Sequence, residues 1–281
     1  MSAKKTWLIT GVSRGLGRTL AETVLARGDA VIGTTRDGHC DLSAEDGALT
    51  IVPLELADAR SIGTAVERAF DVAAKIDVVV NNAGYGLLGA IEHASDKQVE
   101  RLFAVDVLGP IRMIRCVLPY LRQQGAGHIV NITSVAGRDP RPAAGLYSAV
   151  KGAMEALTKA LALEVGPLGI RVTAVAPGGF RTDFLTDLSI DRSAAEEGPY
   201  SPSVDEAMAK FSQGPAGLLG DPSRGAAAIV AAVDSSKPPR RLLLGTDALD
   251  RARRAMAETH SEIDTWEALT RSTDRQETVR P

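Results

Sequence analysis

The sequence lacks the features that mark membrane proteins, secreted proteins and nucleic-acid-binding proteins. No apolar run reaches the ~18 residues that a membrane-spanning helix needs. The first strand-like run begins at Lys4, which leaves no space for a signal peptide. The net charge is −3, and there is no basic stripe for a nucleic acid. We therefore expect neither a membrane nor a nucleic acid as a partner.

Cysteine and histidine are also scarce, with two and four residues. Cys40 and Cys116 are far apart and neither belongs to a C-x-x-C motif, so the sequence predicts a soluble protein of a reducing compartment, the cytoplasm. His39 precedes Cys40, but two residues in one loop make a poor metal site, and the other histidines are scattered. No metal is expected.

Short apolar runs alternate with helical patterns along the chain. The expected strands are 4–10, 30–35, 49–54, 77–81, 128–132, 171–176 and 242–244, and the expected long helices are 59–73, 96–123 and 146–164. This alternation predicts an α/β protein with a doubly wound, Rossmann-type parallel sheet in three layers, α/β/α. The 281 residues fit one such domain, residues 1–281. Ligands of these sheets bind beyond the carboxyl ends of the strands.

A glycine-rich turn joins the first strand to a helix marked by an apolar stripe. Its sequence is Gly11-Val12-Ser13-Arg14-Gly15-Leu16-Gly17, with the spacing G-x-x-x-G-x-G. Gly11 allows a tight turn, Gly15 lets the backbone approach a pyrophosphate, and Gly17 lets helix and strand approach each other. Since the positive end of the helix faces an anion placed there, the turn is predicted to bind dinucleotide phosphates.

Charge at the end of the second strand indicates which dinucleotide binds. Folds that select NAD place an acid about 20 residues past the glycines, to hold the ribose 2′-OH. Here the strand ends in Arg36, and Arg14 lies inside the glycine turn. Two guanidinium groups suit a 2′-phosphate, so NADP(H) is predicted. Asp37 follows directly and would serve the 2′-OH if Arg36 turned outward, so NAD(H) stays possible.

A tyrosine and a lysine four residues apart indicate the chemistry. Tyr147 and Lys151 share one face of a predicted helix, and Ser134 leaves the end of the strand at 128–132. A free tyrosine has a pKa of about 10 and is a poor acid-base group at neutral pH. A fixed ammonium nearby favours the phenolate and lowers that pKa. Tyr147 is therefore predicted to exchange a proton with a reacting oxygen.

These motifs together resemble the short-chain dehydrogenase/reductase family in its single-domain form. They span roughly residues 6 to 185 in the order typical of that family: Thr10–Gly17, Asn81–Gly84, Ser134, Tyr147 with Lys151, and Pro177–Thr182. The resemblance implies the following cofactor-binding residues: Gly11, Ser13, Arg14, Gly15, Leu16, Gly17, Arg36, Glu55, Leu56, Asn82, Ala83, Gly84, Tyr147, Lys151, Pro177, Gly178, Phe180 and Thr182. It also implies a homo-oligomer, dimer or tetramer, that forms through the long helices.

The resemblance gives several of these residues a specific role. Asn82, Ala83 and Gly84 would line the adenine ribose and support the central sheet. The Phe180 backbone and the Thr182 side chain would hold the nicotinamide carboxamide. Lys151 would also donate a hydrogen bond to the nicotinamide ribose.

The chain departs from the family pattern at two positions. Asp106 stands where the family usually has an asparagine that holds a water in a proton relay. An ionised aspartate there would raise the pKa of Tyr147, so we expect either a protonated Asp106 or a different relay, with an altered pH profile. Glu55 stands where an aspartate near the adenine is usual, which affects only the adenine contact.

The region 183–221 breaks the regular pattern and is predicted to form a C-terminal substrate lid; a merely exposed linker is the alternative. It contains three prolines and several apolar residues: Pro199, Pro202, Pro215, Phe184, Leu185, Tyr200, Met208 and Phe211. The tail 248–281 reads as charged and helical, with Trp266 its only large aromatic residue and a frayed end from 271. It would cover either the lid or a neighbouring subunit.

We predict an NADP(H)-dependent carbonyl reductase or alcohol dehydrogenase that acts on a mostly apolar small molecule. Tyr147 would be the acid/base, Ser134 would stabilise charge on the substrate oxygen, and Lys151 and Asp106 would complete the catalytic set. Steroid-like, retinoid-like and polyketide-like substrates are all consistent with the sequence. A protein that binds NADP(H) as a sensor or interaction module with little turnover is one alternative. A sugar-nucleotide epimerase or dehydratase is another, although its glycine spacing differs.

Overall fold

A seven-stranded parallel sheet forms the centre of the computed structural model, which describes residues 4–44, 48–194, 198–212, 214 and 217–275. The strand order is β3-β2-β1-β4-β6-β7-β9. Its strands are β1 (Thr6–Thr10), β2 (Ala30–Thr35), β3 (Leu49–Pro53), β4 (Val78–Asn81), β6 (Gly127–Ile132), β7 (Ile170–Pro177) and β9 (Arg241–Leu244). The predicted doubly wound sheet is confirmed.

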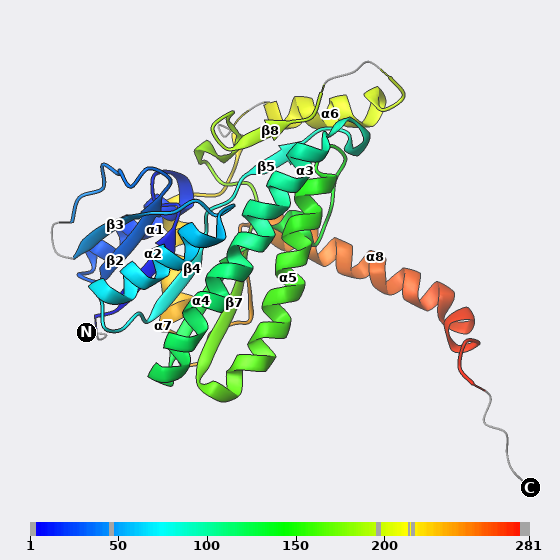
Figure 1. Ribbon diagram of the computed structural model, residues 1–281. Helices are drawn as coiled ribbons and strands as arrows, with labels where there is room; N and C mark the ends of the chain where they lie inside the picture. Colours follow the sequence, from blue (N-terminus) through cyan, green and yellow to red (C-terminus); the bar gives the residue numbers. More distant parts are fainter. Residues whose placement is uncertain (1–3, 45–47, 195–197, 213, 215–216, 276–281) are drawn as a thin grey trace, which may run out of the picture.

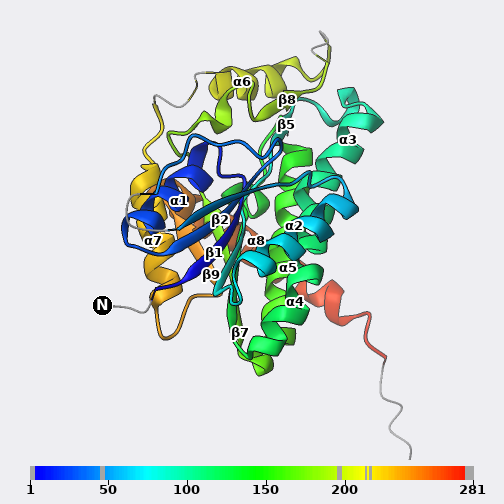
Figure 2. The ribbon, with the colours of Figure 1, turned by 60° about the vertical axis from the view of Figure 1, so that its left-hand side comes forward.

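Helices cover both faces of this sheet, as the view in Figure 2 shows. One face carries α1 (Gly15–Ala26) and α7 (Pro222–Asp234), and the other carries α2 (Ala59–Val72), α4 (Gly109–Gln124) and α5 (Gly145–Val165). Neighbouring residues of β1 point to opposite cores: Trp7 and Ile9 into the first, Leu8 into the second. Because a strand buried on both faces needs apolar residues at every position, its continuous apolar run marks a central strand.

The helix predicted over 96–123 is interrupted. α3 (Asp96–Phe103) begins with a capping box between Ser95 and Gln98, and a π-helical turn over Ala104–Leu108 joins it to α4. π turns are rare and occur frequently at functional sites. This one contains Asp106, whose side chain is buried. Helical spacing in the sequence did not reveal this turn.

A second, small sheet stands above the carboxyl ends of the main strands (Figures 1 and 2). It pairs β5 (Gly86–Leu88) with β8 (Ile190–Arg192) in parallel, and α6 (Ser201–Ser212) lies beside it. The segment 183–221 therefore contains a strand and a helix that the sequence analysis did not predict. The strand escaped notice because three residues are too few to show alternation. Pro215 lies outside the described residues.

The predicted helical tail forms α8 (Thr246–Arg271), which leaves the body of the molecule as one straight rod (Figure 1). Only Ala248 and Ala252 of this helix are buried. Of the end expected to fray, residues 276–281 lie outside the described part of the chain.

Buried His128 on β6 is expected to make the protein sensitive to acid. Burial lowers the pKa of His128 to about 4, and its Nε2 lies 2.8 Å from Thr173 Oγ1. In the unfolded chain this histidine is protonated below about pH 6.5, whereas in the folded protein it stays neutral down to about pH 4. The free energy of unfolding should therefore fall by roughly 2–3 kcal/mol as the pH drops through this range. Thermal unfolding of wild type and His128→Gln between pH 7 and pH 4 tests this. An equal loss of stability in both proteins would contradict it.

Candidate active site

A pocket of about 1150 Å³ is lined by residues that follow the carboxyl ends of the central strands, by Leu88 of β5 and Ile190 of β8, and by the chain after β7. Every predicted cofactor-binding residue except Gly17 lines it. Ser134, Tyr147 and Lys151 line it as well, whereas Asp106 lies behind Lys151. The structure therefore brings together the residues that the sequence singled out from seven separate segments.

The glycine turn owes its shape to positions where a side chain would not fit. Gly11 and Gly15 have φ values of +74° and +61°, which other residues rarely adopt. A Cβ on Gly17 would lie 2.2 Å from Asn82 Nδ2 and 2.3 Å from the Gly11 carbonyl oxygen. Asn82 Nδ2 in turn donates to the carbonyls of Thr10 and Gly11, at 2.9 and 3.1 Å. Gly17 thus contributes close packing rather than pocket wall.

The first turn of α1 is open to an anion. Its N-cap residue, Arg14, makes no side-chain capping hydrogen bond, so the helix N–H groups are left for a ligand. The Arg14 guanidinium instead reaches across the pocket, where Nη2 donates to the Leu188 carbonyl at 2.6 Å and Nε donates to Ser189 Oγ at 3.1 Å. Arg14 therefore ties the glycine turn to the segment 183–221.

Arg36 and Asp37 differ in what their side chains are free to do. Arg36 is exposed at the pocket rim and has no ion-pair partner among the described residues. Asp37 Oδ1 accepts hydrogen bonds from the His39 N–H at 3.1 Å and the Thr35 hydroxyl at 3.2 Å. The His39 N–H lowers the pKa of Asp37, which stays charged. Asp37 thus closes its own turn, while Arg36 is available to a ligand.

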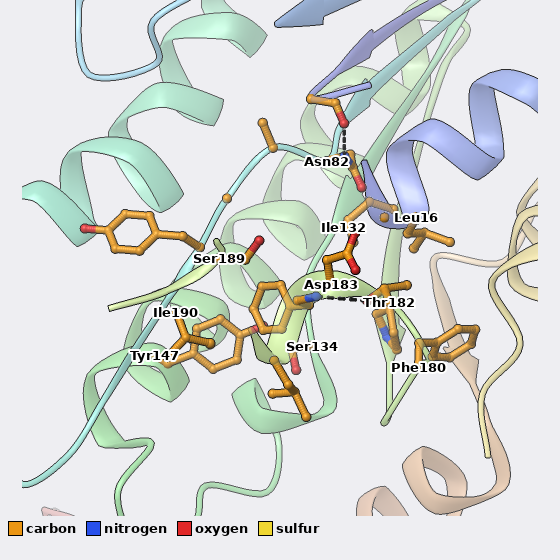
Figure 3. A pocket seen from close by; sticks show the side chains of 18 of the residues that line it. Leu16, Asn82, Ile132, Ser134, Tyr147, Phe180, Thr182, Asp183, Ser189 and Ile190 are labelled. Atoms are coloured by element: carbon orange, nitrogen blue, oxygen red, sulfur yellow. Dashed lines mark hydrogen bonds between the residues drawn. The ribbon is translucent and has the colours of Figure 1, made fainter. Parts of the chain in front are cut away.

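Tyr147 and Ser134 meet at the floor of the pocket, as Figure 3 shows. Ser134 follows β6, and its hydroxyl accepts the Ala136 N–H at 3.1 Å. Tyr147 lies in the first turn of α5, and Lys151 follows one turn later with Nζ 5.6 Å from the centre of the tyrosine ring. The phenol and the serine hydroxyl thus converge from two elements upon one point.

A buried network holds this arrangement in place. Glu155, one turn past Lys151 on α5, accepts the Thr133 hydroxyl at 2.5 Å and is bound by Arg138 through two nitrogens, at 2.8 and 3.0 Å. These contacts attach both sides of the Ser134 loop to the helix that carries Tyr147. Sequence analysis did not identify Glu155, because neither its type nor its spacing sets it apart from a surface acid.

Lys151 has a second charged neighbour. Its Nζ lies 3.0 Å from Asp106 Oδ2, and both side chains are almost fully buried. Asp106 Oδ1 accepts the Tyr85 N–H at 3.1 Å, and Gly84 leaves the space that the carboxylate fills. Burial alone would lower the pKa of Lys151, but the attraction of Asp106 outweighs it and the pKa is raised. Burial also raises the pKa of Asp106, and the Lys151 ammonium and the Tyr85 N–H oppose that rise. We conclude that Lys151 keeps its proton beside the Asp106 carboxyl group.

Burial raises the pKa of Tyr147, while the Lys151 ammonium and the Ser134 hydroxyl oppose the rise and Asp106 adds to it. Lys151 thus lowers the pKa of Tyr147, as predicted, but burial is the larger effect and the net shift is upward. The physical reason is that a phenolate buried here is poorly solvated and the ammonium that would stabilise it is shared with a carboxylate. The expectation that an ionised Asp106 opposes Tyr147 agrees with this result.

The far end of the pocket is apolar. Leu88, Ala144 and Ile190 form a buried cluster there against Phe184, Leu185, Met208 and Phe211. The Phe184 ring centre lies 5.6 Å from that of Tyr147, and Figure 3 shows Ile190 beside the same tyrosine. Sequence analysis missed Ile190, whose role appears only when β8 pairs with β5.

The loop after β7 is shaped by contacts that the sequence did not predict. Asp247, at the start of α8, accepts the Gly179 N–H at 2.8 Å. Thr182 Oγ accepts the Phe184 N–H at 3.3 Å, so this hydroxyl caps the short helical turn Asp183–Leu185. The Phe180 ring packs closely against Gly225 of α7, where a Cβ would lie only 2.6 Å from the ring. The Gly178 and Arg181 N–H groups donate to the carbonyls of Leu244 and Gly220, so elements near the C-terminus hold this loop in place.

Comparison with known proteins identifies the family. The model of the short chain dehydrogenase family matches residues 5–193. The chain belongs to this family. As a short-chain dehydrogenase it is an oxidoreductase that acts on CH–OH or carbonyl groups. Among the described residues, no group of three or more histidine, cysteine, aspartate or glutamate side chains is placed to hold a metal, and no described helix has the length and apolarity to span a bilayer.

Individual relatives agree with this placement. The dehydrogenase is 32% identical to oxidoreductase BOA17 of Botryotinia fuckeliana over 269 residues, 94% of this chain and 97% of that protein. A short-chain dehydrogenase from Streptomyces avermitilis superposes with a TM-score of 0.88 at 38% identity, covering 98% of this chain and 100% of that one. A 3-ketoacyl-(acyl-carrier-protein) reductase from Brucella melitensis, complexed with NADH, has a TM-score of 0.71 at 27% identity and covers 86% and 97%.

Proposed function

We propose that this dehydrogenase interconverts a mostly apolar ketone and a secondary alcohol with NADP(H). The observation that carries the proposal is the convergence of Tyr147 and Ser134 on one wall of a pocket whose opposite end is the open N-terminus of α1. When bound, the nicotinamide supplies the hydride chemistry. The glycine turn, Asn82–Gly84 and the loop Pro177–Thr182 would hold the dinucleotide.

In this proposal the protein's own groups handle the substrate oxygen. Tyr147 donates its proton to that oxygen in reduction and accepts it in oxidation. Ser134 donates a hydrogen bond and stabilises the charge that develops on the oxygen. Lys151 favours the phenolate of Tyr147, and Asp106 sets how strongly it does so.

The preference for NADP(H) over NAD(H) rests on Arg36. Its guanidinium is exposed at the rim where the second strand ends, whereas Asp37 is bound into its own turn. Arg14, the second arginine predicted to hold the 2′-phosphate, is occupied by Leu188 and Ser189. The NADH-bound reductase from Brucella melitensis keeps NAD(H) as the alternative.

The apolar cluster around Leu88 and Ile190 supports an apolar substrate, and we propose the segment 183–221 as its lid. We further propose a single domain over residues 1–281 and a homo-oligomer. We also propose a cytoplasmic location, because both cysteines are free thiols, as is usual in a reducing compartment. A binding protein with little turnover is the second candidate. The Asp106–Lys151 ion pair favours it, since it weakens the activation of Tyr147.

Oxidation of NADPH, and separately of NADH, over a panel of ketones and aldehydes tests the proposal. Turnover of apolar ketones with a preference for NADPH is the expected result. A preference for NADH would overturn the role of Arg36 and leave the chemistry standing. Tight NADPH binding without turnover of any carbonyl would make the binding protein the better conclusion.

Asp106→Asn is expected to shift the pH profile to lower pH. The substitution removes the charge that raises the pKa of Tyr147 and leaves Lys151 with the phenol as its nearest partner, so the pKa of Tyr147 falls. In alcohol oxidation Tyr147 acts as the base, so activity should appear at lower pH than in wild type. The measurement is kcat/KM for alcohol oxidation against pH, with Asp187→Asn, an exposed acid on the pocket rim, as the control. A shift to higher pH would contradict the assignment.

A further inference from the structure

The C-terminal helix α8 carries an apolar stripe that nothing in the described chain covers. Ala248 and Ala252 of its first turns are buried against the body, but every residue from Met256 to the end of the helix is exposed. Met256, Ile263 and Trp266 are exposed by 73%, 61% and 61%. Large apolar side chains exposed together in this way mark an interaction site.

The uncovered side chains continue the face that packs on the body. The residues Ala252, Met256, Thr259, Ile263, Trp266 and Thr270 recur at intervals of three and four. At 3.6 residues per turn, these intervals place them in one line along the helix. The spacing is that of the a and d positions of a coiled coil, which pair with another helix. The stripe therefore has the form of half of a helix–helix contact.

We propose that a second copy of this chain covers the stripe, by pairing its own α8 in the antiparallel direction. The charges beside the stripe favour this partner and this direction. Arg253 and Glu267 lie on the same edge of the stripe, fourteen residues apart. Within one helix Glu267 pairs with Arg271 at 2.7 Å, and this exposed carboxylate can accept a second arginine from the other helix. An antiparallel pair with its twofold axis near His260 places Arg253 of one helix beside Glu267 of the other, and symmetry repeats the contact.

The parallel arrangement is disfavoured by the same charges. In a parallel pair, the position of Glu262 on one helix comes to lie against the position of Glu267 on the other, and both are acids. A membrane surface fits less well than a second copy, because the exposed half of the helix carries Glu262, Asp264 and Glu267, which anionic lipids repel. The antiparallel pair brings Glu262 near its own copy at the twofold axis, but it gains two Arg253–Glu267 contacts, whereas the parallel pair sets acid against acid twice. The antiparallel pair therefore suits the flanking charges better.

The first experiment compares Ile263→Glu with Ala268→Glu by light scattering on the full-length protein. Both substitutions add one acid to an exposed position of α8, but only Ile263 lies on the stripe. The particle mass of Ile263→Glu should be half that of wild type, and the mass of Ala268→Glu should equal that of wild type. Helicity by circular dichroism and the turnover rate should match in all three proteins. An unchanged mass for Ile263→Glu would overturn the proposal.

The second experiment tests the direction of pairing by reversing charges. Arg253→Glu and Glu267→Arg should each raise the dissociation constant roughly five- to thirtyfold, since each contact occurs twice. The double variant should return it to near the wild-type value. A double variant weaker than either single variant would overturn the antiparallel arrangement. Binding of wild type, but not Ile263→Glu, to phosphatidylcholine–phosphatidylserine vesicles would show a membrane as the occupant and would overturn the proposal.

Discussion

Replacing Tyr147 with phenylalanine is expected to lower kcat for ketone reduction by about 10²- to 10⁴-fold, the usual contribution of a positioned acid or base. The substitution removes one oxygen from a half-buried ring that packs beside Phe184 and Lys151, so the packing of the pocket should survive. The dissociation constant of NADPH, measured by fluorescence, should change little. The loss would therefore appear in the chemical step and not in cofactor binding.

Tyr85→Phe provides a matched control within the same pocket. Its hydroxyl is buried without a hydrogen-bond partner in the described structure, and burial raises the pKa of Tyr85 to about 12. This phenol is poorly suited to exchange protons at neutral pH, so its removal should leave kcat within about twofold of wild type. If kcat fell equally in Tyr147→Phe and Tyr85→Phe, the loss would come from removing any phenol hydroxyl from the pocket. Tyr147 would then have no specific role as acid or base.

Replacing Arg36 with alanine is expected to raise KM for NADPH by roughly 10- to 100-fold and to leave KM for NADH unchanged. Hydrogen bonds to a charged group are worth about 1.5–3 kcal/mol, which corresponds to this range. Only NADPH carries the phosphate that the guanidinium would bind. Initial rates with each cofactor, at a saturating ketone concentration, give the ratio directly.

Arg18→Ala is the control for this prediction. Arg18 also lies near the glycine turn, but it pairs with Glu22 and Asp41 and does not line the pocket. Its loss should affect both cofactors equally and slightly. If Arg36→Ala weakened the binding of NADPH and NADH to the same extent, Arg36 would support the fold or contact the adenine, and would not bind the 2′-phosphate.

The sequence predicted the central sheet because its signals are local. The apolar run at Trp7–Ile9, the glycine turn behind it and the helical stripe at Leu20 and Val24 lie within one stretch of chain. Parallel strands buried on both faces show the same apolar run whatever their neighbours are. α7 had comparable signals, Asp221 as its cap and Pro222 in its first turn, which the sequence analysis did not use.

The sequence could not predict contacts made across large separations. β8 exists because Ile190 pairs with Gly86, and Arg14 reaches Leu188 although 174 residues separate them. Short strands and long side chains find such partners only in the folded protein.

By itself, the sequence determined that this protein is an α/β short-chain dehydrogenase with a dinucleotide turn and a Tyr147–Lys151 pair. Only the tertiary structure decided the electrostatic state of that pair. It placed Asp106, in an unexpected π turn, 3.0 Å from Lys151 and buried both. The reason is that residue type and spacing fix which groups are available, whereas a pKa depends on the distance to other charges and on the exclusion of water.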